Sequence, residues 1–363
     1  MKIIDWYILK KYFTTFIFCL LAFTLIVVIV DFSEKTDDFA KTKLPFTTII
    51  TEYYFGFLPR IDAMLFPLFV FIAVIFFTSV MANRSEIIAI LGSGVSFKRF
   101  LLPYVVGGLI LSSLLWWANQ NMLPKANAKW AAFVSQYIDA NYGAYKNQSF
   151  LNNYYFRLDS FSYAGIRYYD TTRKTGNNFF VQTFRNNKLT HNVRAETITW
   201  DTTVNKWRLD KVMERFIDSI KEELKQQPTL QMAYNFKPRD LQRDDYMKDK
   251  LTTSDLKDFI KIEKLRGSEN VNSLELERHT RNAVPLSVLI LTLIGGIIAS
   301  KKIRGGSGFH LAIGIGISLL YILVGRFAAV FATKGNFDPM LAAWLPNIFF
   351  GMLVYYLYRR AAR

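Results

Sequence analysis

The sequence is poor in the residues that most catalytic and metal sites require. It contains one cysteine, Cys19, which lies inside an apolar run, so there is neither a disulfide framework nor a cysteine metal cluster. Its three histidines, His191, His279 and His310, show no metal-ligand spacing. The sequence also lacks the Gly-x-x-x-x-Gly-Lys-Ser/Thr loop that cradles nucleotide phosphates. We therefore expect no catalytic site, no metal site and no cofactor bound by this chain.

Charged residues are missing from long stretches of a chain that is 51% hydrophobic. Such composition excludes an ordinary soluble enzyme and indicates an integral membrane protein. Six apolar runs are long enough to cross a bilayer: residues 12–30, 61–81, 100–117, 283–300, 309–331 and 341–357. The first run is longer than a signal-peptide core and no small-residue cleavage site follows it, so we interpret it as an uncleaved span.

The net charge of +16 does not lie in any recognisable nucleic-acid motif, so we expect no nucleic-acid partner. The cations instead form four clusters beside the predicted spans. These are Lys2, Lys10 and Lys11; Arg84, Lys98 and Arg99; Lys301, Lys302 and Arg304; and Arg359, Arg360 and Arg363. All four fall on one side of a six-span topology, and the positive-inside rule makes that side cytoplasmic. Both termini are thus predicted to be cytoplasmic.

Between the third and fourth spans, residues 118–280 lack continuous apolar runs and are predicted to form an exported domain. Short alternating segments read as strands at 154–158, 163–169, 179–184, 189–200, 206–209 and 230–236. This pattern favours an antiparallel sandwich, jelly roll or barrel, and periodicity does not choose among them. A short helix is predicted at 255–266. The predicted domains are therefore residues 1–117, 118–280 and 281–363.

Residues 83–97 connect the second and third spans and do not look like an ordinary polar loop. Ser85 can act as a helix N-cap, and Glu86 occupies the favourable first turn. Ile87, Ile88, Leu91 and Val95 are predicted to line one helix face, and Gly92 and Gly94 to end the helix. A short amphipathic helix at the membrane surface needs lipid headgroups or a partner protein to contact its exposed face.

The predicted spans carry almost no charge near their centres. Arg60, Asp62 and Arg326 are close to span ends. An ion-coupled carrier usually needs ionisable groups at mid-depth, so these spans suit an amphiphile with acyl chains better than a small ion.

Three segments carry a resemblance to a known family. They are residues 58–96, which include all but the last residue of the 83–97 helix; residues 251–256; and Glu277-Arg278-His279-Thr280-Arg281, which precedes Pro285. In these segments, and in its order of three spans, a β-rich domain and three spans, the chain resembles the LptF/LptG family. Members of that family are permease subunits of the ABC transporter that exports bacterial lipopolysaccharide. The family's Glu-x-His-Arg-Arg motif keeps its second arginine here as Arg281, whereas Thr280 replaces the first.

The resemblance implies six transmembrane helices with a periplasmic β-jellyroll, in the inner membrane. It implies that residues 83–97 form a coupling helix that docks on a cytoplasmic ABC ATPase dimer, with Glu86 pairing with an ATPase arginine. The implied coupling residues are Arg84, Ser85, Glu86, Ile87, Leu91, Gly92 and Gly94. ATP is then used by the partner, and this chain is not an enzyme. Lys35, Lys41 and Lys43 are the implied contacts for lipopolysaccharide phosphates.

The other implied partners are a second LptF/LptG-type permease subunit, or a second copy of this chain, and a periplasmic jellyroll bridge. Two alternatives from other classes remain open. The first is a membrane-anchored receptor or assembly scaffold with a ligand-binding β domain, which leaves the 83–97 helix without a task. The second is a membrane enzyme acting on lipid-linked sugars, for which Glu277, Asp62 and Glu52 are the candidate acids.

Overall fold

The computed structural model describes residues 2–138, 150–218, 221–241, 247–268, 270–302 and 306–361. The chain divides into two compact units. The first, here called the helical unit, comprises Met1–Phe133, Lys248–Leu256 and Asn272–Arg363. The second, the sheet unit, comprises Val134–Met247 and Lys257–Val271. Of the predicted cation clusters, Arg304 and Arg363 lie outside the described residues.

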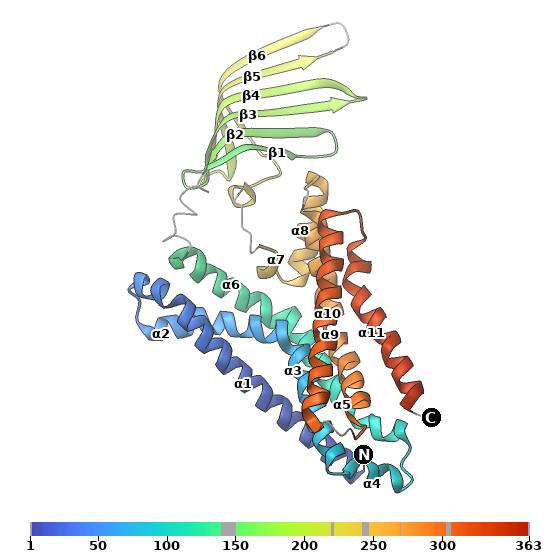
Figure 1. The fold of residues 1–363 in the computed structure, drawn as a ribbon. Coiled ribbons are helices and arrows are strands. Elements are labelled where there is room, and N and C mark those ends of the chain that lie inside the picture. Colours follow the sequence, from blue (N-terminus) through green and yellow to red (C-terminus); the bar gives the residue numbers. More distant parts are fainter. Residues whose placement is uncertain are drawn as a thin grey trace. The chain divides into compact units, whose positions relative to one another are not determined.

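The helical unit contains the predicted membrane spans (Figure 1). Its long helices are α1 (Ile3–Thr42), α3 (Phe55–Asn83), α5 (Phe97–Trp117), α9 (Val271–Ala299), α10 (Gly306–Lys334) and α11 (Pro339–Ala361). Within the described residues, six helical segments are long and apolar enough to cross a membrane, and each contains one predicted run. The six-span prediction is confirmed. A three-residue helix, α2 (Phe46–Thr48), and a π-helical stretch, η1 (Ile49–Tyr54), lead from the end of α1 into α3.

Helical structure continues beyond the third span. After α5 the chain runs through η2 (Ala118–Met122), α6 (Leu123–Phe133) and η3 (Val134–Ile138), whereas the sequence predicts a strand-rich domain from residue 118. The sequence did not predict this helix because α6 buries one face, including Ala131 and Phe133, and exposes Lys125 and Lys129 on the other. A half-polar helix lacks the continuous apolar run by which the spans are found.

The centre of the helical unit is formed by α3 and α9. About 67% of the most apolar window of each is buried, against 6% for α1, 17% for α10 and 22% for α11. Close packing joins α1, α5 and α9: the Tyr12 ring lies where a Cβ on Gly107 would be 2.5 Å away, and the Tyr12 hydroxyl is 2.7 Å from Thr292 Oγ1. Gly107 is therefore required for the approach of α1 to α5.

The sheet unit contains one antiparallel sheet whose six described strands follow each other in sequence order (Figure 1). The strands are β1 (Phe150–Arg157), β2 (Ser162–Asp170), β3 (Thr175–Arg185), β4 (Lys188–Asp201), β5 (Lys206–Ile217) and β6 (Glu222–Met232). The predicted β domain is confirmed. The strand order is a meander, in which each strand pairs with the next one along the chain. Asn186 and Asn187 both adopt the left-handed conformation that a tight hairpin between β3 and β4 requires.

Strand β6 begins earlier than the predicted segment 230–236. The prediction missed its first half, Glu222-Glu223-Leu224-Lys225-Gln226, because these residues do not alternate between apolar and polar. The apolar face of the sheet is partly covered by the chain that follows β6. Phe236 is buried against Trp207, and Trp207 Nε1 donates a hydrogen bond to the Phe236 carbonyl at 2.8 Å. The sheet thus has its own aromatic core.

Between β6 and α9, the described residues form three helical segments. They are a 3₁₀ turn, η5 (Pro238–Leu241), and the helices α7 (Met247–Lys250) and α8 (Thr253–Arg266). The helix predicted at 255–266 is confirmed as α8. It begins two residues earlier because Thr252 precedes it as a cap, with its Oγ1 accepting from the Asp255 N–H at 3.3 Å.

Candidate functional site

The connection between α3 and α5 contains a helix, as the sequence predicts, but this helix spans only Glu86–Gly92, so Val95 lies beyond its end. Helix α4 (Glu86–Gly92) lies beside the start of α1 (Figure 1). Ser85 occupies the N-cap position but makes no capping hydrogen bond with its side chain, so that part of the prediction is wrong. Its backbone is left-handed, with φ of 61°, and its Oγ accepts a hydrogen bond from Lys302 Nζ at 3.0 Å. Gly94, with φ of 88°, ends the connection in a conformation that favours glycine.

One face of α4 is anchored in the helical unit. Ile87 is buried in the core cluster, and Ile90 and Leu91 pack against that cluster. Ile88 is 56% exposed, so its assignment to the buried stripe is wrong. The positions i, i+3 and i+4 counted from Ile87 are Ile90 and Leu91, whereas Ile88 points about 100° away from Ile87 around the helix. The α4 helix therefore packs against the spans through three side chains and leaves Ile88 accessible.

Glu86 is the charged centre of this region, and both of its donors come from α1. The Tyr7 hydroxyl donates to Glu86 Oε2 at 2.9 Å. Lys11 Nζ lies 3.0 Å from Oε2 and 3.4 Å from Oε1. The Lys11 ammonium also sits 4.3 Å from the centre of the Tyr7 ring. These partners are more than seventy residues away from Glu86 along the chain, and no local sequence pattern indicates the contact.

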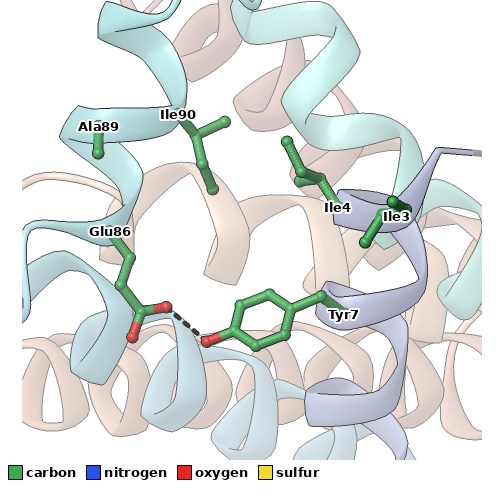
Figure 2. Close-up of a pocket in the computed structure, with 6 residues that line it drawn as sticks. All are labelled: Ile3, Ile4, Tyr7, Glu86, Ala89 and Ile90. Atoms are coloured by element: carbon green, nitrogen blue, oxygen red, sulfur yellow. Dashed lines mark hydrogen bonds between the residues drawn. The ribbon is translucent and has the colours of Figure 1, made fainter.

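A cavity of about 410 Å³ adjoins this carboxylate, and Figure 2 shows the residues that line it. Ile3, Ile4 and Tyr7 of α1 lie on one side, and Glu86, Ala89 and Ile90 of α4 lie on the other. Glu86 is the one charged side chain among these lining residues. The cavity therefore offers apolar surface beside a single negative charge.

The start of α1 is fixed to α5 by an ion pair. Arg99 donates through both terminal nitrogens to Asp5, at 2.7 and 2.6 Å, and the Asp5 side chain is only 3% exposed. The Lys2 backbone N–H donates to the same carboxylate at 2.6 Å. This two-pronged pair holds one wall of the cavity against the helical unit.

The remaining predicted coupling residues contribute in different ways. Arg84 follows α3 and is exposed. Gly92 ends α4 where an added Cβ would meet no atom within 4 Å, so close packing is not its role. Ser96, which was not singled out, caps α5 by accepting from the Arg99 N–H at 3.3 Å.

The three lysines predicted to contact lipid phosphates lie near the far end of α1 in different settings. Lys35 is partly buried, 3.3 Å from Asp31, and its ammonium also donates to the Tyr53 hydroxyl. Lys41 is exposed and lies 3.7 Å from Asp38. Lys43 follows α1 in the left-handed conformation and is exposed. Lys35 is therefore engaged within the protein, whereas Lys41 and Lys43 face outward.

Two of the segments that carry the family resemblance meet at Arg281. Its guanidinium, 6% exposed, donates to Glu277 Oε1 at 3.0 Å and to the backbone carbonyls of Leu251 and Lys248 at 2.8 Å each. We call these four residues the Arg281 network. The same stretch is held by Arg60, whose guanidinium lies 3.3 Å from Asp249.

The alternative enzyme reading named Glu277, Asp62 and Glu52. Glu277 is committed to Arg281, and Asp62 accepts a hydrogen bond from Thr24 at 2.9 Å. Glu52 lies in η1. Within the described part of the chain, no group of three or more His, Cys, Asp or Glu side chains could hold a metal ion.

Comparison with known proteins yields one informative match. The family model described as lipopolysaccharide export system permease LptF/LptG matches residues 6–360. No curated protein matches the chain. The matched region runs from the start of α1 to the last residues of α11 and includes α4, the sheet and the Arg281 network. With its membrane-spanning helices and nearly full-length match, this chain belongs to the LptF/LptG family of lipopolysaccharide export permeases and is a multi-pass inner-membrane protein.

Proposed function

We propose that this chain is one permease half of a transporter that extracts lipopolysaccharide from the inner membrane, driven by a separate cytoplasmic ATPase dimer. Membership of the LptF/LptG family supports the assignment of this chain as a lipopolysaccharide permease. The observation that carries the ATPase coupling is the geometry of α4. Its buried face, around Ile87, is fixed to the spans, while Glu86 lines an open apolar cavity. A carboxylate beside apolar surface fits an arginine of the ATPase that is flanked by apolar residues.

The orientation follows from charge. The α4 end of the helical unit carries Lys10, Lys11, Arg99 and Lys302, and the positive-inside rule assigns such an end to the cytoplasm. The sheet unit then lies in the periplasm. An ATPase in the cytoplasm meets α4 and the start of α1.

The lipid path is assigned to apolar surface that the helical unit leaves exposed. Along α1, Phe18, Leu21 and Leu25 are all more than half exposed. A second permease subunit, or a second copy of this chain, would face this surface and complete a cavity that accepts the acyl chains. Lys41 and Lys43 are the best placed of the predicted lysines to meet lipid phosphates, because their side chains are exposed, whereas Lys35 is partly buried beside Asp31 and Tyr53.

The sheet unit is assigned the transfer to a periplasmic bridge of similar fold. In the described sheet, β1 and β6 are the edge strands, and each is paired on one side only. An edge strand is a ready template for pairing with a further strand. A bridge made of antiparallel strands can therefore extend this sheet while apolar side chains guide the acyl chains.

The test is reconstitution of the full chain in vesicles with its cognate ATPase, a second permease subunit and the bridge protein. We expect ATP-dependent transfer of lipopolysaccharide to the bridge. Glu86→Ala should weaken ATPase binding by about tenfold or more, which corresponds to loss of a charged contact of about 1.4 kcal/mol. Glu34→Ala, which removes an exposed carboxylate at the other end of α1, is the matched control and should behave as wild type.

Normal ATPase binding and normal export in Glu86→Ala would refute the coupling role. Absence of any stoichiometric ATPase from a mild-detergent pull-down of the wild-type chain would favour the receptor or scaffold alternative.

A further inference from the structure

The contacts of Glu86 are divided unequally between its two oxygens. Oε2 accepts from the Tyr7 hydroxyl at 2.9 Å and lies 3.0 Å from Lys11 Nζ, whereas Oε1 has Lys11 Nζ at 3.4 Å. An ionised carboxylate can accept about four hydrogen bonds. The Oε1 side is therefore still able to accept from an incoming cation while Tyr7 and Lys11 remain bound to Oε2.

The burial of the pair allows such a shared arrangement. The side chains of Lys11 and Glu86 are 28% and 25% exposed. They are shielded enough for the ion pair to be stronger than a surface pair, and open enough for another protein to reach them from the cavity. By contrast, Asp5 and Arg99 form a closed pair, because Arg99 already engages both oxygens of Asp5.

The Glu86 contacts join two elements that the chain does not connect directly. Helix α4 follows α3 and precedes α5, so backbone continuity already ties it to those two helices. Besides apolar packing around Ile87, α4 contacts α1 through the polar interactions of Glu86 with Tyr7 and Lys11. Helix α1 continues without interruption from Ile3 to Thr42 and ends in the region of Lys41.

We propose that Tyr7 and Lys11 are positioning residues that hold Glu86 and pass the movement of α4 into α1. This inference rests on the proposed function, because it assumes that an ATPase moves α4. In this arrangement Glu86 binds partners through both oxygens: the ATPase cation binds Oε1, and the α1 donors hold Oε2. The first span is then drawn along with α4 during the ATPase cycle.

The decisive variant is Lys11→Met, which removes the ammonium and keeps an unbranched side chain. We expect the complex with the ATPase to assemble and to hydrolyse ATP, while lipopolysaccharide transferred per ATP falls about tenfold, equivalent to about 1.4 kcal/mol of coupling. Lys10→Met is the matched control, because Lys10 is the exposed neighbour and, within the described residues, forms no ion pair with Glu86. It should export as wild type.

Two further variants separate positioning from mere folding. Lys11→Arg keeps a cation that can reach the carboxylate and should restore transfer per ATP. Tyr7→Phe removes only the hydroxyl and should lower transfer per ATP less than Lys11→Met does, since the neutral donor is the weaker partner of a carboxylate.

Equal transfer per ATP in Lys11→Met and Lys10→Met would overturn the inference. It would also be overturned if Lys11→Met lost ATPase binding as completely as Glu86→Ala, because Lys11 would then belong to the docking contact itself. These outcomes differ from failure of the proposed function, in which Glu86→Ala itself binds the ATPase and exports normally.

Discussion

Two charged networks in the helical unit have opposite designs. The Arg281 network is closed: its guanidinium is 6% exposed, and two of its acceptors are backbone carbonyls. The Glu86 network is open: its ion pair is about one quarter exposed and borders a cavity. Backbone acceptors cannot move to another partner, whereas a partly exposed carboxylate can exchange or share its partners. We infer that the first network holds the fold together and the second transmits force.

The largest effect on stability is expected for Arg281→Ala. This change leaves the carbonyls of Lys248 and Leu251 without their donor and Glu277 without its counter-charge. Breaking a buried charged network of this kind should lower the free energy of unfolding by about 3–5 kcal/mol. Thermal unfolding of the purified full chain measures it, with Arg278→Ala as the neighbouring control. Unchanged unfolding of Arg281→Ala would break the comparison.

The next effect is expected for Asp5→Asn. The neutral amide cannot replace the two-oxygen ion pair with Arg99, and the site is nearly closed to water. The loss should be about 2 kcal/mol. Asp37→Asn on the exposed side of the same helix is the control and should unfold as wild type. A loss of this size in Asp5→Asn would sharpen the comparison. It would show that Asp5 belongs with the structural network, although it lies beside the cavity.

A smaller change in stability is expected for Glu86→Gln. Its ion pair is partly exposed, and the amide still accepts from Tyr7, so the loss should be below about 1 kcal/mol. Its ATP-driven transfer should nevertheless be strongly reduced under the proposed function. Parallel unfolding and transfer measurements decide this; a stability loss as large as that of Arg281→Ala would place Glu86 among the structural residues.

The smallest effect, and of opposite sign, is expected for Ser85→Gly. Glycine adopts the left-handed conformation found at Ser85 without strain, although it gains more freedom in the unfolded chain. The net stabilisation should be at most about 1 kcal/mol. Ser93→Gly, at a position with φ of −76°, is the control and should not stabilise. A loss of stability in Ser85→Gly would show that its contact with Lys302 outweighs the backbone strain.

Local patterns were sufficient to predict the spans, the position of α4 and most strands. Each depends on residues close in sequence, such as the helical spacing of Ile87 and Leu91, two of the four apolar residues predicted to share one face. The family motifs also directed attention to Arg281. What it contacts was not predictable, because carbonyls about thirty residues away are brought to it only by folding.

The α1 contribution to the site was missed for the same reason. Lys11 was interpreted only as part of the basic cluster before the first span, Tyr7 was not singled out, and nothing near either residue in sequence indicates Glu86. The failure at Ile88 is different. The five-residue apolar run 87–91 fits several helix faces, and only the short length of α4 and its packing select Ile87.

The length of α1 gives its contact with α4 a mechanical meaning. Forty residues of helix measure about 60 Å, roughly twice the hydrocarbon thickness of a bilayer. As a stiff rod pivoting at one end, α1 would carry its other end about 5 Å sideways for a tilt of only about 5°. A small change in the tilt of α1, set beside Glu86, would thus move the other end of the helix far enough to widen or close a passage for an acyl chain.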